Sequence, residues 1–149
     1  MLNYGAAAQN YFSYNTSKLA NVGYENEISA ASVPETIDSI VMEGSVDGIR
    51  LYGMSLVFES QIAVRFYYSV SEDVENYSFT TGDQKNCEIQ MGNGMYYVEV
   101  SDINPQNYTD IIMMQVSDGT ESMTVGYSPL HYIVRKYHAD NSDSLKALV

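Results

Sequence analysis

The sequence predicts a mainly β protein, an Ig-like antiparallel β-sandwich with short α-helices at both termini. Three observations lead to this prediction. From about residue 37 to residue 127, short runs rich in β-branched and aromatic residues follow a period of two. Turn residues separate these runs at regular intervals, as is typical of sandwiches and barrels. At both ends of the chain, apolar residues recur instead at helical spacing.

The composition bounds the class of protein before any element is assigned. The 149 residues carry 19 acidic and 7 basic side chains, for a formal net charge of −12, and 45% of them are apolar. This length fits one domain, or one domain with appendages, and can bury a core without a metal or disulfide. The acidic balance argues against nucleic acid and against an anionic membrane surface as partners. No apolar run approaches the roughly 20 residues of a membrane span, and no signal peptide is visible.

The first 36 residues divide into a helical segment and a connector. Residues 1–22 begin with an apolar stripe on one helical face, and three consecutive alanines add helix propensity. Residues 23–36 show no sustained period, and Pro34 disfavours a helix there. We expect an extended connector over this stretch. The stripe consists of Tyr4, Ala8, Tyr11 and Phe12.

The predicted sandwich domain spans residues 37–127. The runs at residues 49–58 and 62–70 are separated by polar residues and predict a hairpin. In the second run alternate residues must face opposite sides of the sheet. A Gly92-Asn93-Gly94 turn between residues 87–91 and 95–100 predicts a second hairpin. Further strands are expected at residues 77–80, 111–116 and 123–127, with a turn around Asp118-Gly119.

The last segment, residues 128–149, is again predicted to be helical. Ser128 precedes Pro129, which places a capping residue before a proline suited to the first helical position. An apolar stripe follows at Leu130, Ile133, Val134 and Tyr137, and a second one begins at Leu145, Leu148 and Val149. Because the second stripe is too short to form a stable helix alone, we expect each end of the chain to be half of one longer helix.

The chain resembles a repeat unit found in large surface proteins of anaerobic Gram-positive gut bacteria. The helical segment LNYGAAAQNYFSYNTSKLAN carries the most specific part of the resemblance, and LYGMSLVFESQIAVRFYYSV, MYYVEVSDINPQ and VGYSPLHYIVRKYHADNSDSLKALV extend it over nearly the whole chain in rotated order. In that family an Ig-like sandwich is followed by a helical stretch. The resemblance implies an extracellular, cell-surface or cell-wall setting beside glycoside hydrolase or adhesion modules. It supplies no catalytic residues, and the final helix of the family's unit is missing here.

Two partners follow from this interpretation. Neighbouring modules of the same polypeptide would bury the terminal stripes. Self-association through the terminal helices is the alternative, because two apolar stripes at opposite ends can pair between molecules.

Catalytic and metal-binding patterns are weak in this sequence. There is no G-x-S-x-G motif, and His131 and His138 lie seven residues apart on one predicted helix, so a structural role for both is favoured over catalysis. No zinc pattern is present, and Cys87 is expected to be a small buried residue. Weak calcium candidates are the loop acids Glu72, Asp73 and Glu75, with a second cluster at Asp140, Asn141 and Asp143, although acidic loops are usually just solvated. We therefore expect no enzyme activity, no cofactor and no bound metal.

Sugar binding is the ligand hypothesis that the sequence allows. Carbohydrate modules on sandwiches use exposed aromatic rings, on which the C–H faces of sugars pack. Arg65 and Tyr67 share one face of a strand, and one of Tyr96 and Tyr97 must also point away from the core. The competing interpretation is that these tyrosines only cover a second packed face, and the absence of Trp favours it.

The sequence thus predicts a non-catalytic structural or presentation module of an extracellular bacterial surface protein. The alternative is a carbohydrate-binding module or adhesin domain, with candidate ligand residues Arg65, Tyr67, Tyr96 and Tyr97. A third, weaker hypothesis is a glycoside hydrolase accessory with activity of its own. Its chemistry needs two carboxyl groups flanking a deep cleft, which a small sandwich with short turns offers poorly.

Overall fold

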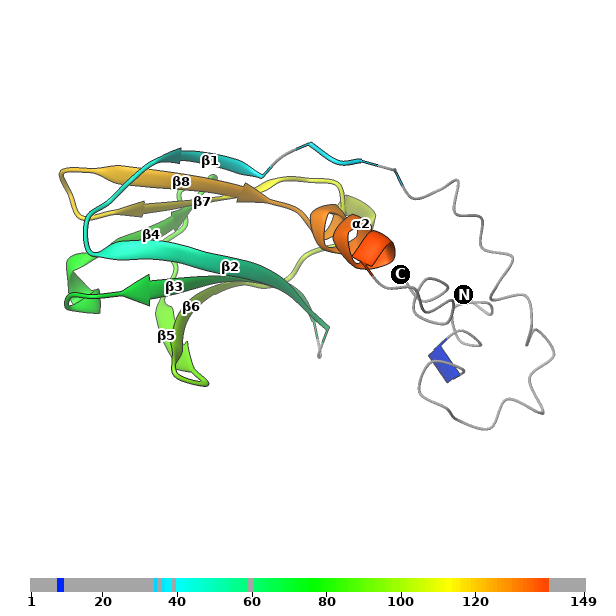
Figure 1. The fold of residues 1–149 in the computed structure, drawn as a ribbon, viewed down its shortest axis with the longest axis horizontal. Helices are drawn as coiled ribbons and strands as arrows, with labels where there is room; N and C mark the ends of the chain where they lie inside the picture. Colours follow the sequence, from blue (N-terminus) through cyan, green and yellow to red (C-terminus); the bar gives the residue numbers. More distant parts are fainter. Residues whose placement is uncertain (1–7, 10–33, 35, 39, 59–60, 140–149) are drawn as a thin grey trace. The chain divides into compact units, whose positions relative to one another are not determined.

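The structure, a computed structural model, describes residues 8–9, 34, 36–38, 40–58 and 61–139. This part of the chain contains eight strands and the helix α2 (Figure 1). The strands are β1 (Val41–Gly44), β2 (Ile49–Phe58), β3 (Ile62–Val70), β4 (Ser78–Thr81), β5 (Ile89–Gly92), β6 (Met95–Val100), β7 (Ile112–Ser117) and β8 (Ser122–Tyr127), and α2 spans Pro129–Ala139. Residues 38–132 form one compact unit that holds all eight strands; the rest of the chain belongs to a second unit.

The strands form two antiparallel four-stranded sheets, with the orders β1-β8-β7-β4 and β2-β3-β6-β5. The prediction of a mainly β sandwich is therefore confirmed. Three pairs of consecutive strands are hairpins, namely β2-β3, β5-β6 and β7-β8, and the first strand pairs with the last. This strand order differs from the ABED and CFG sheets of a constant immunoglobulin domain, so the chain shares the sandwich architecture but has its own connections.

The β5-β6 hairpin shows how directly turn residues set the register. Gly92 pairs with Met95, which leaves a two-residue loop. Both loop residues have positive φ, 53° at Asn93 and 77° at Gly94. This is the geometry of a type I′ turn, whose twist matches that of the flanking strands.

The core lies between the two sheets and follows the alternation along each strand. On β3, Val64 and Phe66 are fully buried and Tyr68 nearly so. The opposite sheet contributes Phe79 on β4 and buried residues of β7 and β8. The rings of Tyr68 and Phe79 lie 5.4 Å apart between centroids, so they join the two layers directly. The buried residues of β7 and β8 are Met114, Val116, Met123, Val125 and Tyr127.

The Tyr68 hydroxyl is buried and has no hydrogen-bond partner among the described residues. Burial, with a smaller effect from Cys87, raises the pKa of Tyr68 because the charged form is desolvated. Tyr68→Phe removes a polar atom that makes no bond, so we expect the melting temperature to stay equal or rise. Tyr77→Phe is the matched control, since the Tyr77 hydroxyl donates to the Asp47 carbonyl oxygen at 2.9 Å. It should lower the melting temperature in the same calorimetric series, and a larger loss from Tyr68→Phe would contradict the prediction.

The predicted terminal helices are covered only in part by the described residues. Helix α2 begins where Ser128-Pro129 predicted a start, and Val134 in its apolar stripe is buried. Ala8 and Gln9 of the N-terminal segment are helical. The other stripe residues, Tyr4, Tyr11, Phe12, Leu145, Leu148 and Val149, lie outside the described residues. Within the described ranges, no helix is long and apolar enough to span a membrane.

Candidate functional site

The candidate site lies on the outer face of the β2-β3-β6-β5 sheet. In the register of β3 and β6, Arg65 pairs with Glu99 and Tyr67 pairs with Tyr97. Since Phe66 between them points into the core, the alternation turns these four side chains outward. The structure therefore brings together three of the four residues expected to bind a ligand, Arg65, Tyr67 and Tyr97.

Tyr96 is the fourth candidate, and the structure places it on the other face. It pairs with the buried Tyr68, and paired residues of an antiparallel ladder share a face. The alternation along β6 requires Tyr96 and Tyr97 to point to opposite sides, and the pairing with β3 decides which of them is outside. Tyr96 therefore does not join the other three candidates.

The Tyr97 ring is held from several sides. Its centroid lies 5.9 Å from that of Tyr67, with the rings tilted by 45°. The Arg65 guanidinium carbon lies 4.8 Å from the same centroid, within cation–π range. The Tyr97 hydroxyl donates to Oε1 of Gln90 on β5 at 2.8 Å. A Cβ added at Gly92 would stand 3.0 Å from Cε1 of Tyr97, so the glycine leaves room for the ring. These contacts hold the Tyr97 ring in one orientation, and a preorganised ring loses little conformational entropy when another group packs on it.

The charges beside the rings form a pair. Arg65 Nε donates to Oε2 of Glu99 at 2.6 Å, and both side chains are about one-quarter exposed. The hydrogen bond from Arg65 to Glu99 raises the pKa of Arg65, with smaller effects from the neighbouring tyrosines. A partly exposed pair of this kind contributes up to about 1 kcal/mol to stability. Arg65 is therefore neutralised within the site and acts chiefly as a rigid neighbour of Tyr97.

Sequence reasoning missed a third outward ring, Tyr52 on β2. The β2-β3 register is irregular between Leu51 and Gly53: Leu51 pairs with Tyr68 and Gly53 with Tyr67. Leu51 faces inward with Tyr68, so Tyr52 faces outward, and Gly53 beside it also faces outward with Tyr67. This β-bulge leaves Tyr52 73% exposed on the same face. The sequence indicates this bulge. Apolar residues occupy odd positions before Gly53, at Ile49 and Leu51, and even positions after it, at Met54 and Leu56.

We call the outward set of Tyr52, Ser55, Tyr67, Gln90 and Tyr97, with the Arg65–Glu99 pair, the tyrosine face. Hydrogen bonds link it across strands, since Ser55 Oγ donates to the Tyr67 hydroxyl at 3.3 Å. Strands in a sheet lie about 4.8 Å apart, so four strands spread the set over about 14 Å. This is a shallow, ring-lined surface with hydroxyl, amide and carboxylate groups at its edges.

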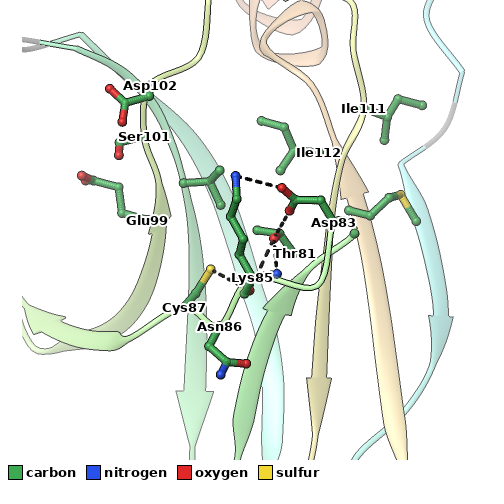
Figure 2. Close-up of a pocket in the computed structure, with 13 residues that line it drawn as sticks. Thr81, Asp83, Lys85, Asn86, Cys87, Glu99, Ser101, Asp102, Ile111 and Ile112 are labelled. Carbon is green, nitrogen blue, oxygen red and sulfur yellow. Dashed lines mark hydrogen bonds and ion pairs between the residues drawn. The ribbon is translucent and has the colours of Figure 1, made fainter.

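A hollow of about 600 Å³ lies at the β4-β5 connection and shares Glu99 with the tyrosine face (Figure 2). Lys85 Nζ forms an ion pair with Asp83 Oδ2 at 2.9 Å, and Asp83 also accepts from the Thr81 hydroxyl. In Figure 2 the Lys85–Asp83 pair and Thr81 lie between two sets of side chains. Glu99 and Asp102 are on one side, and Ile111 and Ile112 are on the other. Its charged groups satisfy one another and are exposed, so they stabilise the loop rather than form a strong ligand site.

Cys87 borders the same hollow and is partly buried. Desolvation raises the pKa of its thiol, which keeps it protonated at neutral pH. Because the thiolate is the reactive form, this cysteine is poorly suited to nucleophilic chemistry.

Ser128 and His131 form hydrogen bonds with each other at the start of α2. Ser128 Oγ lies 2.7 Å from His131 Nδ1, and the Ser128 backbone N–H donates to the same nitrogen at 3.1 Å. Because that N–H can only donate, Nδ1 accepts, and Nε2 carries the proton toward the Asp38 carbonyl oxygen 3.1 Å away. The His131 ring thus accepts from the Ser128 backbone N–H at the start of α2, which is one half of a capping box. Ser128 is only 1% exposed, so a substrate cannot reach its hydroxyl.

Among the acids considered for calcium, Asp73 has a local structural role. Asp73 caps a short 3₁₀ helix (Val74–Asn76) by accepting from the Glu75 backbone N–H at 3.2 Å. Within the described ranges, which include Glu72, Asp73 and Glu75, no three His, Cys, Asp or Glu side chains gather as a metal site. The second cluster, Asp140, Asn141 and Asp143, lies outside them.

Asp118 gives a pH-dependent prediction. Its Oδ1 accepts from the backbone N–H groups of Glu121 and Thr120 at 2.7 Å each, and these bonds lower its pKa below 3.8. A lowered folded-state pKa gives stability that is fully present above the ordinary value and lost as pH falls through the lowered one. Asp118→Ala should therefore lower the melting temperature at pH 7 and have a shrinking effect below about pH 4. Thermal melts from pH 7 to pH 2 test this; an effect independent of pH would contradict it.

Comparison with protein family models, with curated proteins and with solved structures finds no match to this chain.

Proposed function

We propose that this chain is a non-catalytic module of a larger extracellular protein and that its tyrosine face binds carbohydrate. The observation that carries the proposal is the row of three outward tyrosines, one on each of the adjacent strands β2, β3 and β6. Sugars present C–H faces that pack on aromatic rings and hydroxyls that need hydrogen-bond partners. The face offers both, with rings in a row and polar groups of Ser55, Gln90 and Glu99 beside them.

A presentation role is compatible with binding and forms part of the proposal. The two sheets share one continuous core, so the unit of residues 38–132 suits a spacer between neighbouring modules. In the cell-surface setting implied by the resemblance, such a module would hold its parent protein on a polysaccharide or display an adhesive surface.

Affinity gel electrophoresis on a panel of plant and host polysaccharides tests the binding function. We expect slowed migration on at least one polymer and loss of the slowing in Tyr97→Ala. Tyr108→Ala is the matched control, because Tyr108 is 44% exposed and lies in the β6-β7 connection away from the face. Retention on no polymer, or equal retention of Tyr97→Ala and the unchanged protein, would contradict the proposal.

The competing enzyme hypothesis is tested on the same protein. A screen on common glycosides should show no turnover above background. Turnover that Ser128→Ala abolishes would instead assign chemistry to the Ser128–His131 pair and overturn the non-catalytic part of the proposal.

A further inference from the structure

We propose that the sugar bound by the tyrosine face carries a carboxylate, as uronic acid polymers do, and that Arg50 recognises this group. This inference rests on the proposed function. It adds the chemical class of the ligand and one specificity residue that sequence reasoning did not single out.

The few basic residues of the sandwich are concentrated on one face. Residues 38–132 contain 14 acidic residues but three basic ones, Arg50, Arg65 and Lys85. Arg65 and Arg50 both belong to the outer face of one sheet. Arg50 pairs with the exposed Ser69, and its neighbour Ile49 is buried in the core, so the alternation turns Arg50 outward. On a strongly acidic protein, two of three cations of this unit thus lie on the face that carries the tyrosine row.

The two arginines differ in how they are paired. Arg65 is bound to Glu99 at 2.6 Å, whereas no acidic side chain of the described residues lies within ion-pair distance of the exposed Arg50. Glu99 is the acidic residue on the outward register positions of strands β2, β3 and β6. On these outward register positions the arginines therefore outnumber the acids by one, and the guanidinium of Arg50 is complementary to a carboxylate.

The position of Arg50 fits a role in specificity. Arg50 and Tyr52 are two residues apart on the same face, which separates them by about 7 Å along the strand. Ser69, opposite Arg50, is likewise two residues from Tyr67. A sugar ring stacked on Tyr52 and Tyr67 would therefore place an equatorial substituent within reach of the Arg50 guanidinium. Ordinary alternation along β2 places Tyr52 beside Arg50, and the bulge between Leu51 and Gly53 keeps Tyr52 on the same face as Tyr67.

The discriminating experiment compares polygalacturonate with its methyl-esterified form, which has the same backbone without the charge. We expect tighter binding of the acidic polymer by isothermal titration calorimetry and a decline of its affinity with added salt. Arg50→Gln should weaken binding of the acidic polymer about tenfold, the effect of losing one charge-assisted hydrogen bond, and leave the esterified polymer unaffected. Lys85→Gln is the control, since it removes an equal charge at the β4-β5 connection instead of beside Tyr52 on β2.

The outcomes separate this inference from the proposed function. If both polymers bind equally and Tyr97→Ala abolishes both, the inference is overturned while carbohydrate binding stands. If Arg50→Gln and Lys85→Gln weaken acidic binding by the same factor, long-range charge accounts for the preference and the role of Arg50 is overturned. If the protein binds neither polymer but is retained on a neutral one, the acidic class is likewise overturned.

Discussion

Phe66→Ala is expected to lower the free energy of unfolding by about 3–5 kcal/mol, the usual cost of removing a buried phenylalanine side chain. Phe66 is 0% exposed and sits on the central strand β3, in the core that both sheets share. Its removal leaves a cavity where neighbouring side chains have no partner atoms. Because small domains are stable by only about 5–15 kcal/mol, this variant should be close to unfolding at 37 °C. Urea unfolding followed by tyrosine fluorescence measures the change.

The adjacent residue supplies the control for that prediction. Tyr67→Ala removes a ring of similar size from the opposite face of the same strand, where Tyr67 is only half-buried. We expect the free energy of unfolding to fall by about 1 kcal/mol, because the Tyr67 ring contacts other outward side chains and not the core. Equal losses from the two variants would mean that the face we describe as outer is buried, and the proposed binding surface would then be wrong.

Gly44→Ala is expected to be the most damaging of the glycine substitutions in turns. Gly44 closes β1 with φ of 76°, and a Cβ there would stand 2.2 Å from the Ser122 carbonyl oxygen. The left-handed conformation alone costs a non-glycine residue about 1–2 kcal/mol. The collision is with backbone and cannot be relieved by a rotamer change, so β1 must move away from β8. We expect a total loss above about 2 kcal/mol and faster amide hydrogen exchange along β1.

Gly94→Ala separates the cost of the left-handed backbone conformation from the cost of the steric collision. Gly94 has nearly the same φ, 77°, but nothing lies within 4 Å of its added Cβ. Its loss should therefore reflect conformation alone and stay near 1–2 kcal/mol. A Gly94→Ala variant as unstable as Gly44→Ala in thermal melts would show that the approach of β1 to Ser122 is looser than described.

The hairpins were predictable because their signals are local. Period-two alternation within β3 and the Asn93-Gly94 turn predicted the residues that pair, and the structure has β2, β3 and β6 at the expected bounds. The order of the strands was not predictable, because it depends on which hairpins meet across the core. No pattern within β1 indicates that it pairs with β8, about 80 residues later.

The candidate site divides in the same way. Alternation alone required Arg65 and Tyr67 to share a face and required Tyr96 and Tyr97 to point apart. The choice of Tyr97 over Tyr96 came only with the β3-β6 register, which places Tyr97 opposite Tyr67. The bulge at Tyr52 is indicated by the shift of apolar residues from odd to even positions along β2. That Tyr52 lies on the same face as Tyr67, however, depends on the pairing of β2 with β3.

By itself, then, the sequence determined the sandwich class, the hairpins and the outward residues within single strands, since backbone geometry decides these over a few residues. The tertiary structure decided which outward side chains become neighbours and which cation stays unpaired. The physical reason is that strand pairing joins residues far apart in the chain. A register shift of one residue would have turned a different set of tyrosines to solvent.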